Sequence, residues 1–100
     1  MNEYQKRIMT MESINTLLCP FCGQVATNKH HIVPRSQGGG KGPTVTVCGN
    51  GNTSGCHGDF HKHKLHLYVH KGRWVYYRSD EPIKFDKALA DVTGWRYLND

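Results

Sequence analysis

The chain has 100 residues, of which 37% are hydrophobic, and a formal net charge of +5. It has no run of about 20 apolar residues that could cross a membrane, and no apolar signal segment follows its polar first residues. These features exclude a membrane-spanning protein and favour one cytoplasmic domain, residues 1–100, in which thiols bind metal more often than they form disulfides. Domains of this size bury a small core and commonly need a disulfide or a structural metal for stability.

Hydrophobic periodicity and turn residues predict short elements separated by loops. The side chains of Ile8, Met11 and Ile14 lie near one face of a predicted N-terminal helix, and Lys71-Gly72 is expected to turn a hairpin. The expected elements are a helix over 3–16, a strand over 29–33, a Gly-rich loop over 36–43, a β-branched strand over 44–47, a long turn over 49–55, a helix from 57 to about 64, a β-hairpin over 65–78 and a helix over about 85–92.

Four cysteines form two groups along the chain. Cys19 and Cys22 are a Cys-x2-Cys pair in a tight turn, and a Gly-rich segment between Cys48 and Cys56 can fold back and bring those two thiols together. Two such pairs are a common way to hold tetrahedral Zn²⁺, so we expect one structural zinc site. Two disulfides, buried free thiols, or a mixed site in which His57 replaces a cysteine are the alternatives.

All seven histidines lie between residues 30 and 70. His30 and His31 are adjacent on a predicted strand, so their side chains point to opposite faces and cannot both project at one metal. His57 and His61 are four residues apart on a predicted helix and share a face, so they can converge on one ion. The remaining histidines are expected to be ordinary hairpin or helix-end residues: His63, His66 and His70.

Positive charge is concentrated in the segment that carries most of these residues. Between Lys29 and Arg78 there are eight Lys or Arg residues and a single acid, Asp59. This asymmetry is typical of a protein that binds a polyanion, most often nucleic acid. A basic surface that serves only solubility has the same composition and stays open as an alternative.

Residues 19–64 combine, in order, the Cys-x2-Cys pair, a His-His-x-x-Pro strand end, a Gly-rich loop, a β-branched strand, a Cys-Gly-x-Gly…Gly-Cys-His-Gly run and a His-x3-His helix. This ordered set resembles the small phage-type HNH endonucleases. The resemblance implies an α+β fold with a ββα-metal core, in which a β-hairpin and a helix surround one divalent metal. We expect the four-cysteine zinc site to hold this core together, and a C-terminal hairpin and helix over about 65–97 to follow it.

The resemblance also implies a role for each histidine of the motif. By position, His30 matches the metal ligand of the first strand, and His31 matches the general base. His57 and His61 match metal ligands on the helix.

The family pattern has one further residue, an Asn shortly before the second strand, which braces the loop and orients the base. This chain has Gly42-Pro43-Thr44 at that place. Asparagines elsewhere are out of register with it: Asn28, Asn50 and Asn52. A backbone carbonyl of the Gly-rich loop could substitute for the missing amide.

The activity implied by the resemblance is metal-dependent hydrolysis of DNA phosphodiester bonds, with His31 as the base. The catalytic metal would be Mg²⁺, Mn²⁺, Ni²⁺ or Zn²⁺, and histidine ligands favour the softer ions over Mg²⁺. DNA is the expected partner, a homodimer or a phage packaging or accessory partner is open, and the location is a bacterial cytoplasm. The side chains expected to contact phosphates are Lys29, Arg35, Lys41, Lys62 and Lys64, with Lys71 and Arg73 extending this track.

Three other functions compete with cleavage. A zinc-knuckle module that binds nucleic acid or protein without cutting is favoured by the missing Asn and disfavoured by the intact set of His30, His31 and His57. A phage accessory protein acting through a partner would use the basic hairpin and C-terminal helix as a docking surface. A zinc hydrolase of another substrate is disfavoured by the cationic setting.

Overall fold

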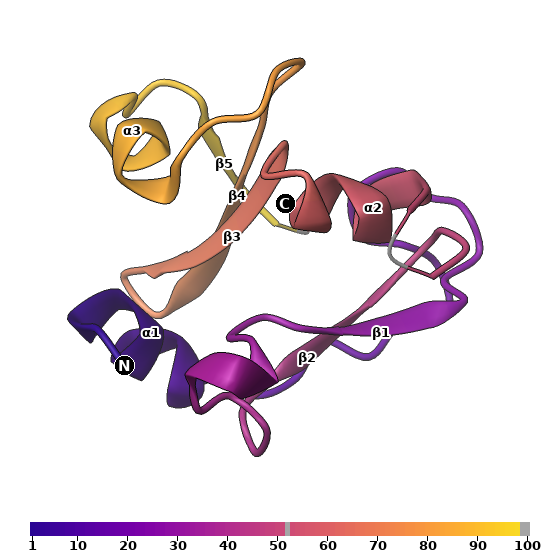
Figure 1. Cartoon of the computed structure of the whole chain (residues 1–100), viewed down its shortest axis with the longest axis horizontal. Helices are drawn as coiled ribbons and strands as arrows, with labels where there is room; N and C mark the ends of the chain where they lie inside the picture. Colours follow the sequence, from indigo (N-terminus) through magenta and orange to yellow (C-terminus); the bar gives the residue numbers. More distant parts are fainter. Residues whose placement is uncertain (52, 99–100) are drawn as a thin grey trace.

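The computed structural model describes residues 1–51 and 53–98 and has an α+β fold with two antiparallel sheets (Figure 1), as the sequence predicts. Its elements, in chain order, are α1 (Glu3–Met9), β1 (Asn28–His31), a 3₁₀ turn η1 (Arg35–Gln37), β2 (Thr44–Val47), α2 (Gly55–His61), β3 (Leu65–His70), β4 (Arg73–Arg78), α3 (Phe85–Ala90) and β5 (Trp95–Tyr97). Within the described residues, no helix has both the length and the apolar character that a membrane crossing requires.

The first sheet is the antiparallel pair β1 and β2, in which His30 lies opposite Val45 and His31 opposite Thr44. β-Branched residues fit a pleated, buried surface, and Val45 and Val47 are fully buried. Strand alternation places the side chains of His30 and His31 on opposite faces of this hairpin. His30 therefore faces α2, whereas His31 does not.

The second sheet has the strand order β3-β4-β5. β3 and β4 form the predicted hairpin, and its turn residues Lys71 and Gly72 both have positive φ, 53° and 74°, as a tight two-residue hairpin turn requires. β5 was not predicted, because three residues are too few to show a strand period. It pairs with β4 after Gly94, where a Cβ atom would lie 2.3 Å from the ring of Tyr77, so only glycine allows this approach.

Two hydrophobic clusters join the sheets and helices. α2 contacts both β2 and β3, and α1 packs on β3, so β3 links the two halves of the structure (Figure 1). One cluster lies between the sheets and comprises Ile14, Cys19, Val45, Val47, Cys48, Cys56, Leu65, Leu67 and Leu98. The other lies against α1 and comprises Ile8, Val33, Tyr68, Val69 and Val75.

α1 ends at Met9, so the predicted continuation to residue 16 is wrong. Thr10 caps the helix with hydrogen bonds to the preceding turn. Ile14 instead donates its backbone N–H to the carbonyl of Thr44 at 2.8 Å and extends the edge of the first sheet. Ile14 is therefore buried because it pairs with β2. Its spacing from Ile8 and Met11, which favoured a longer helix, does not reflect helical structure.

Three other elements differ from their predicted bounds: α2 is Gly55–His61 instead of 57–64, α3 is Phe85–Ala90 instead of 85–92, and β1 is Asn28–His31 instead of 29–33. After α2, His63 adopts the left-handed region at φ 60°, which does not continue a helix. α3 stops before Asp91, whose carboxylate accepts a hydrogen bond from the Tyr77 hydroxyl at 2.7 Å and so draws the chain back to β4.

The loop after β1 depends on glycine at one position. A Cβ atom on Gly39 would lie 1.9 Å from the backbone oxygen of Val33. Gly39→Ala is therefore expected to lower the free energy of unfolding by at least about 1–3 kcal/mol, measured by urea denaturation. In Gly40→Ala the nearest atom, on the Arg35 side chain, is 4.0 Å away, so this control should stay within about 0.5 kcal/mol of the parent. Equal urea midpoints for Gly39→Ala and Gly40→Ala would contradict the close contact between Gly39 and Val33.

Candidate metal centres

Four cysteine side chains converge from separate parts of the chain. Cys19 and Cys22 come from the turn that precedes β1, Cys48 directly follows β2, and Cys56 is the second residue of α2. Their Sγ atoms all lie within 4.8 Å of one another, and those of Cys22 and Cys48 are 3.3 Å apart. A tetrahedral Zn²⁺ with Zn–S bonds of about 2.3 Å holds its sulfurs about 3.8 Å apart, so this cluster is suited to a structural metal ion.

Hydrogen-bond donors surround the sulfurs. Burial raises the pKa of Cys19, but backbone hydrogen bonds, the largest from Cys48, outweigh it and lower this pKa below its ordinary value. Burial also raises the pKa of Cys56, and the guanidinium of Arg78 opposes the rise by donating to its Sγ at 3.1 Å. Arg78 also pairs with Asp59 at 2.7 Å. A buried thiol is expensive to ionise without nearby positive charge, and a bound metal would supply that charge.

The structure brings together the four cysteines that the sequence grouped as one site. All four are free thiols, so the two-disulfide alternative is not adopted. The mixed alternative is also disfavoured, because the ring of His57 belongs to a separate histidine cluster. Arg78 was missed by sequence reasoning, since it lies on β4, 22 residues after Cys56, and only the tertiary fold brings the two together.

Metal removal gives a direct test of the cysteine site. Zinc binding in small metal domains contributes about 10–16 kcal/mol of apparent free energy, as much as the whole stability of a typical domain, about 5–15 kcal/mol. A strong chelator is therefore expected to unfold the chain, measured by circular dichroism together with zinc released per chain. Cys56→Ser should lose zinc, whereas His70→Ala, at an exposed position, should retain it. Four fast-reacting thiols in the folded, untreated protein would contradict the site.

A second cluster contains three histidines. His30 projects from β1, and His57 and His61 project from successive turns of α2. The ring centroids are 5.2 Å apart for His30 and His57, 5.4 Å for His30 and His61, and 5.0 Å for His57 and His61. One nitrogen from each ring lies within 4.8 Å of the others, while a tetrahedral ion with bonds of about 2.1 Å holds its nitrogens about 3.4 Å apart. Small rotations would bring three ligands onto one ion.

Phe60 fixes the orientation of one of these rings. Its ring stacks on His30 with a centroid distance of 4.4 Å and an interplanar angle of 16°, and its edge contacts Phe21 at 5.5 Å. Stacking on a packed aromatic ring restricts rotation of the imidazole. Sequence reasoning missed Phe60, although its place between His57 and His61 on a predicted helix was a usable signal.

Two histidines of this cluster, His30 and His57, have a lowered pKa and are held neutral. Burial, followed by repulsion from His57, His61 and His31, lowers the pKa of His30 to about 3. Burial and then the charge of His61 lower the pKa of His57. Neutral imidazole is the form that binds a metal. The Nδ1 atom of His57 is also buried without a hydrogen-bond partner among the described residues, and a buried polar atom of this kind needs a compensating partner.

Gly58 allows α2 to approach the preceding loop. From the sequence alone, glycine at this position is expected to destabilise the helix by about 1 kcal/mol relative to alanine. In the structure, a Cβ atom there would lie 2.8 Å from the backbone of Thr53, so a larger residue would push α2 and its two histidines away from the loop.

His31 stands apart from the cluster. It lies on the opposite face of β1 from His30 and is half-buried. Its ring makes no hydrogen bond, ion pair or ring contact with any residue that the structure describes. This position agrees with the expectation that His30 and His31 do not share one metal.

The remaining histidines and asparagines have other surroundings. His66 Nε2 lies 2.8 Å from the carbonyl of Ile83, His63 stacks near His66, and His70 is exposed at the end of β3. The amide of Asn28 donates to the carbonyl of Gly49 and so ties β1 to the loop before α2. Asn52 lies outside the described residues.

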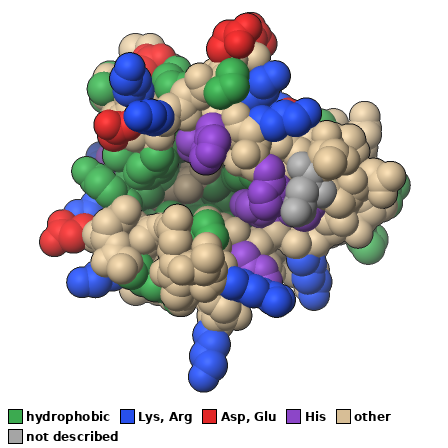
Figure 2. Space-filling view, in the orientation of Figure 1, with side chains coloured by type: hydrophobic (Ala, Val, Ile, Leu, Met, Phe, Trp, Pro, Cys, Tyr) green, Lys and Arg blue, Asp and Glu red, His purple; other side chains and the backbone are tan. Residues whose placement is uncertain are grey.

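A cleft of about 490 Å³ leads away from the histidine cluster. His30 and His61 line one part of it, and Asn2, which caps α1, lines another part together with Gln5 and Ile8 of that helix. Figure 2 shows histidine side chains around a hollow near the centre of this face, with Lys and Arg side chains beyond them. Two of the three clustered histidines, His30 and His61, therefore border this cleft.

The structure describes all five basic residues that the sequence predicts to contact phosphates. All are exposed except the half-buried Lys64: Lys29, Arg35, Lys41, Lys62 and Lys64. Lys62 Nζ donates to the carbonyl of Thr53 at 3.4 Å. Within the described residues, the cationic groups of the other four make no hydrogen bond or ion pair, which leaves them accessible to a polyanion.

Comparisons with protein-family models, with curated proteins and with solved structures found no match. The possible chemistry of the chain is therefore inferred from its cysteine cluster and its histidine cluster. The thiols are suited to a closed, structural ion, and the three imidazoles beside a cleft are suited to an ion that keeps a coordination position for a ligand.

Proposed function

We propose that this chain is a metal-dependent endonuclease of the HNH type that hydrolyses phosphodiester bonds in DNA. The observation that carries the proposal is the convergence of His30, His57 and His61, two of which, His30 and His61, line a cleft. A pure binding module has no need for three imidazoles that converge on one point. The cationic segment from Lys29 to Arg78 favours a polyanionic substrate.

The order of elements supports the same assignment. β1 supplies the first histidine, β2 pairs with it, and α2 supplies the other two. This order of elements supports the hairpin-plus-helix core that the HNH resemblance implies. The cysteine cluster supports the arrangement further, since Cys56 and His57 are adjacent on α2 and a metal held by the thiols would fix the start of this helix.

A divalent ion held by the three histidines would supply Lewis-acid stabilisation of the charge that develops on the phosphate and leaving oxygens. Imidazole ligands favour Mn²⁺, Ni²⁺ or Zn²⁺ over Mg²⁺, which prefers oxygen. His31 accepts the proton of the attacking water, the role for which an imidazole is suited near neutral pH. The exposed cations Lys29, Arg35 and Lys41 bind neighbouring phosphates and position the strand.

A plasmid-nicking assay across a panel of divalent metals tests the function. His31→Ala is expected to fold, to keep its zinc and to nick about 10²–10⁴-fold more slowly than the parent, because it removes the general base. His70→Ala, a histidine outside both clusters, should nick at the parent rate. Parent-like nicking by His31→Ala would overturn the assignment of the base.

Metal binding by the histidine cluster can be measured separately. His57→Ala is expected to shift the metal dependence of nicking to higher concentration and to weaken Co²⁺ binding, followed by the visible absorption of the ion. Replacing one of three ligands should not remove the structural zinc, and zinc content measured on the same sample checks this. Unchanged Co²⁺ affinity in His57→Ala would place the metal elsewhere.

A second candidate function is a zinc-stabilised module that binds nucleic acid without cutting it. The observation that favours it is Gly42-Pro43-Thr44, where the HNH pattern has an Asn. DNA binding with no nicking by any metal of the panel would support this function and contradict the nuclease.

A further inference from the structure

The cleft beside the histidine cluster has an uncharged lining. The described residues that line it have aliphatic, aromatic, amide or imidazole side chains, and none of them is Lys, Arg, Asp or Glu. Figure 2 shows hydrophobic side chains next to the histidines at this hollow. The volume of about 490 Å³ lies within the range of small-molecule sites, about 300–1,000 Å³. A phosphate group finds no cationic partner inside such a cleft, whereas a flat, uncharged group is suited to it.

Charged residues lie next to the cleft-lining residues in the chain, and basic ones outnumber acidic ones. The basic residues directly adjacent to a lining residue are Lys6, Arg7, Lys29, Arg35, Lys62, Lys64 and Lys84. The acids in such positions are Glu3, Asp59 and Asp86, and Asp59 is paired with Arg78. The charge around the cleft therefore favours an anionic ligand, while the lining favours an uncharged group on that ligand.

Tyr4 of α1 provides an aromatic surface in this cleft. Its ring contacts those of Tyr68 and Phe85 in edge-to-face geometry, with centroids 5.6 Å apart in both pairs. Within the described residues no ring stacks in parallel on Tyr4, which is 43% exposed. Phe60, another lining residue, is already stacked on His30. Tyr4 is therefore the aromatic residue of the cleft best suited to stack with a flat ligand.

A chain of hydrogen bonds orients an amide donor in the same cleft. Gln5 Oε1 accepts from the backbone N–H of Asn2 at 3.0 Å, and Gln5 Nε2 donates to Oε1 of Gln37. The carbonyl of Gln37 is thus engaged, while its NH₂ group makes no hydrogen bond with any residue that the structure describes. All three residues line the cleft. An oriented amide N–H donates to the acceptor atoms on the edge of a nucleobase.

The cleft also borders the proposed cleavage centre, because His30 and His61 are among its lining residues. In DNA each base is attached to the sugar between two phosphates. A base inside the cleft therefore brings its own phosphates to the histidines and to the cations around them. The uncharged lining and the charged surroundings would then each bind a different part of one nucleotide.

We propose that the cleft binds one unpaired base of single-stranded DNA, stacked on Tyr4 and hydrogen-bonded by Gln37, beside the phosphate that the histidine cluster cuts. The inference rests on the proposed function and names its substrate class. A paired base cannot enter the cleft without first leaving the duplex stack. Stacking tolerates any sequence, because every base has a π-face. The expected preference is therefore for unpaired DNA with little dependence on sequence.

The three glutamines of the chain provide a readout that is specific to the cleft. Gln5 and Gln37 line it, whereas Gln24 is exposed and lies beside the first cysteine pair. Their side-chain NH₂ signals in a ¹H–¹⁵N NMR spectrum are assigned with Gln37→Ala and Gln24→Ala. The probes are a short DNA strand of mixed sequence, its duplex with the complementary strand, and an abasic chain with the same number of phosphates. The protein keeps its zinc, and no other metal is added.

The single strand is expected to shift the Gln37 signal along a saturating curve and to leave the Gln24 signal in place. The abasic chain should bind at least about five-fold more weakly, since it keeps the phosphates and lacks the bases. The duplex should move the Gln37 signal little. Equal affinities for the single strand and the abasic chain, or equal Gln37 shifts with the single strand and the duplex, would overturn the proposal.

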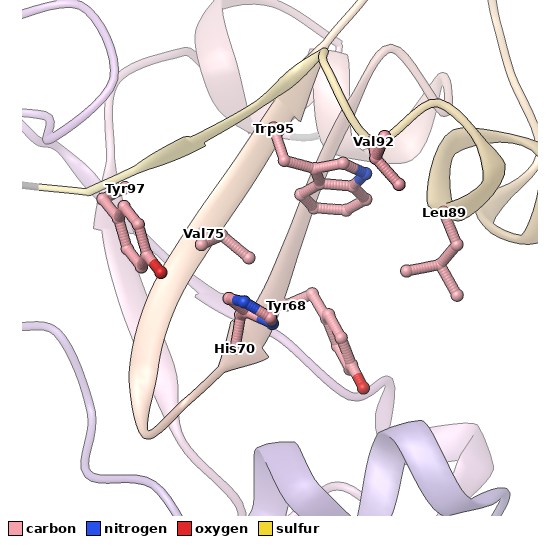
Figure 3. Close-up of a pocket in the computed structure, with 7 residues that line it drawn as sticks. All are labelled: Tyr68, His70, Val75, Leu89, Val92, Trp95 and Tyr97. Carbon is pink, nitrogen blue, oxygen red and sulfur yellow. The ribbon is translucent and has the colours of Figure 1, made fainter.

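Tyr4→Leu keeps an apolar side chain in the cleft and removes the stacking ring. Affinity for the single strand should fall about 5- to 150-fold, the equivalent of one stacked base, and affinity for the abasic chain should not change. Tyr97→Leu is the matched control, because Tyr97 lines a separate cavity of about 330 Å³ that shares no lining residue with the cleft (Figure 3). It should bind the single strand as the parent does. An equal loss in both variants would contradict the role of Tyr4.

Cleavage assays separate this inference from the proposed nuclease. With the metal panel, the single strand should be cut faster than relaxed duplex, and supercoiled plasmid should fall between them, because negative supercoiling favours strand separation. Equal rates on the single strand and the relaxed duplex, in the parent and in Tyr4→Leu, would leave the nuclease standing and overturn the role of the cleft. Saturable binding of the single strand at Gln37 with no cutting by any metal would support the base site and contradict the nuclease.

Discussion

Four sulfur atoms within 4.8 Å of one another define how the remaining segments of this small chain can pack. The cysteines belong to the turn before β1, the end of β2 and the start of α2. Cys19, Cys48 and Cys56 are buried and form part of the main hydrophobic cluster. The side chains that would bind a metal thus also fill the core, so a thin apolar interior and a metal-binding site are the same structural feature.

The positions of the clustered histidines depend on the cysteine cluster. His57 follows Cys56 directly, and its backbone N–H donates to the carbonyl of Cys48 at 3.1 Å. Arg78 extends the same link to the second sheet, because one guanidinium contacts both the Cys56 sulfur and the Asp59 carboxylate. The position of α2 relative to β1 is therefore fixed at its first turn, and His61 one turn later faces His30 as a result.

Local patterns in the sequence predicted a large part of this arrangement. The β-branched run of β2, the Lys71-Gly72 turn and the spacing of cysteines and histidines each depend on nearby residues, and each has its predicted place in the fold. What the sequence did not reveal depends on tertiary contacts. Ile14 pairs with β2 rather than continuing α1, and β5 exists only through its pairing with β4.

The same distinction applies to the two candidate sites. Spacing was sufficient to pair Cys19 with Cys22 and His57 with His61, because residues three or four positions apart lie close together in a turn. Phe60, which orients His30, and Arg78, which contacts Cys56, act across the fold. The sequence neighbours of Arg78 carry no sign of its role, whereas the place of Phe60 between His57 and His61 was a sign that sequence reasoning missed. A pocket lined by Tyr68, Val75 and Trp95 likewise arises only when three strands and α3 are brought together.

The close approach of Gly49 and Gly55 has a consequence for how the chain tolerates changes in length. A Cβ atom on Gly55 would lie 2.6 Å from the Cα atom of Gly49, so the loop between them begins and ends at nearly the same point. Residues inserted after Gly51 would cost little, since doubling a flexible loop costs only about 0.6 kcal/mol. A single deletion between His57 and His61 would instead rotate one imidazole by about 100° around the helix. Natural variation in length can therefore accumulate in this loop, whereas the helix that follows it must keep its residue count.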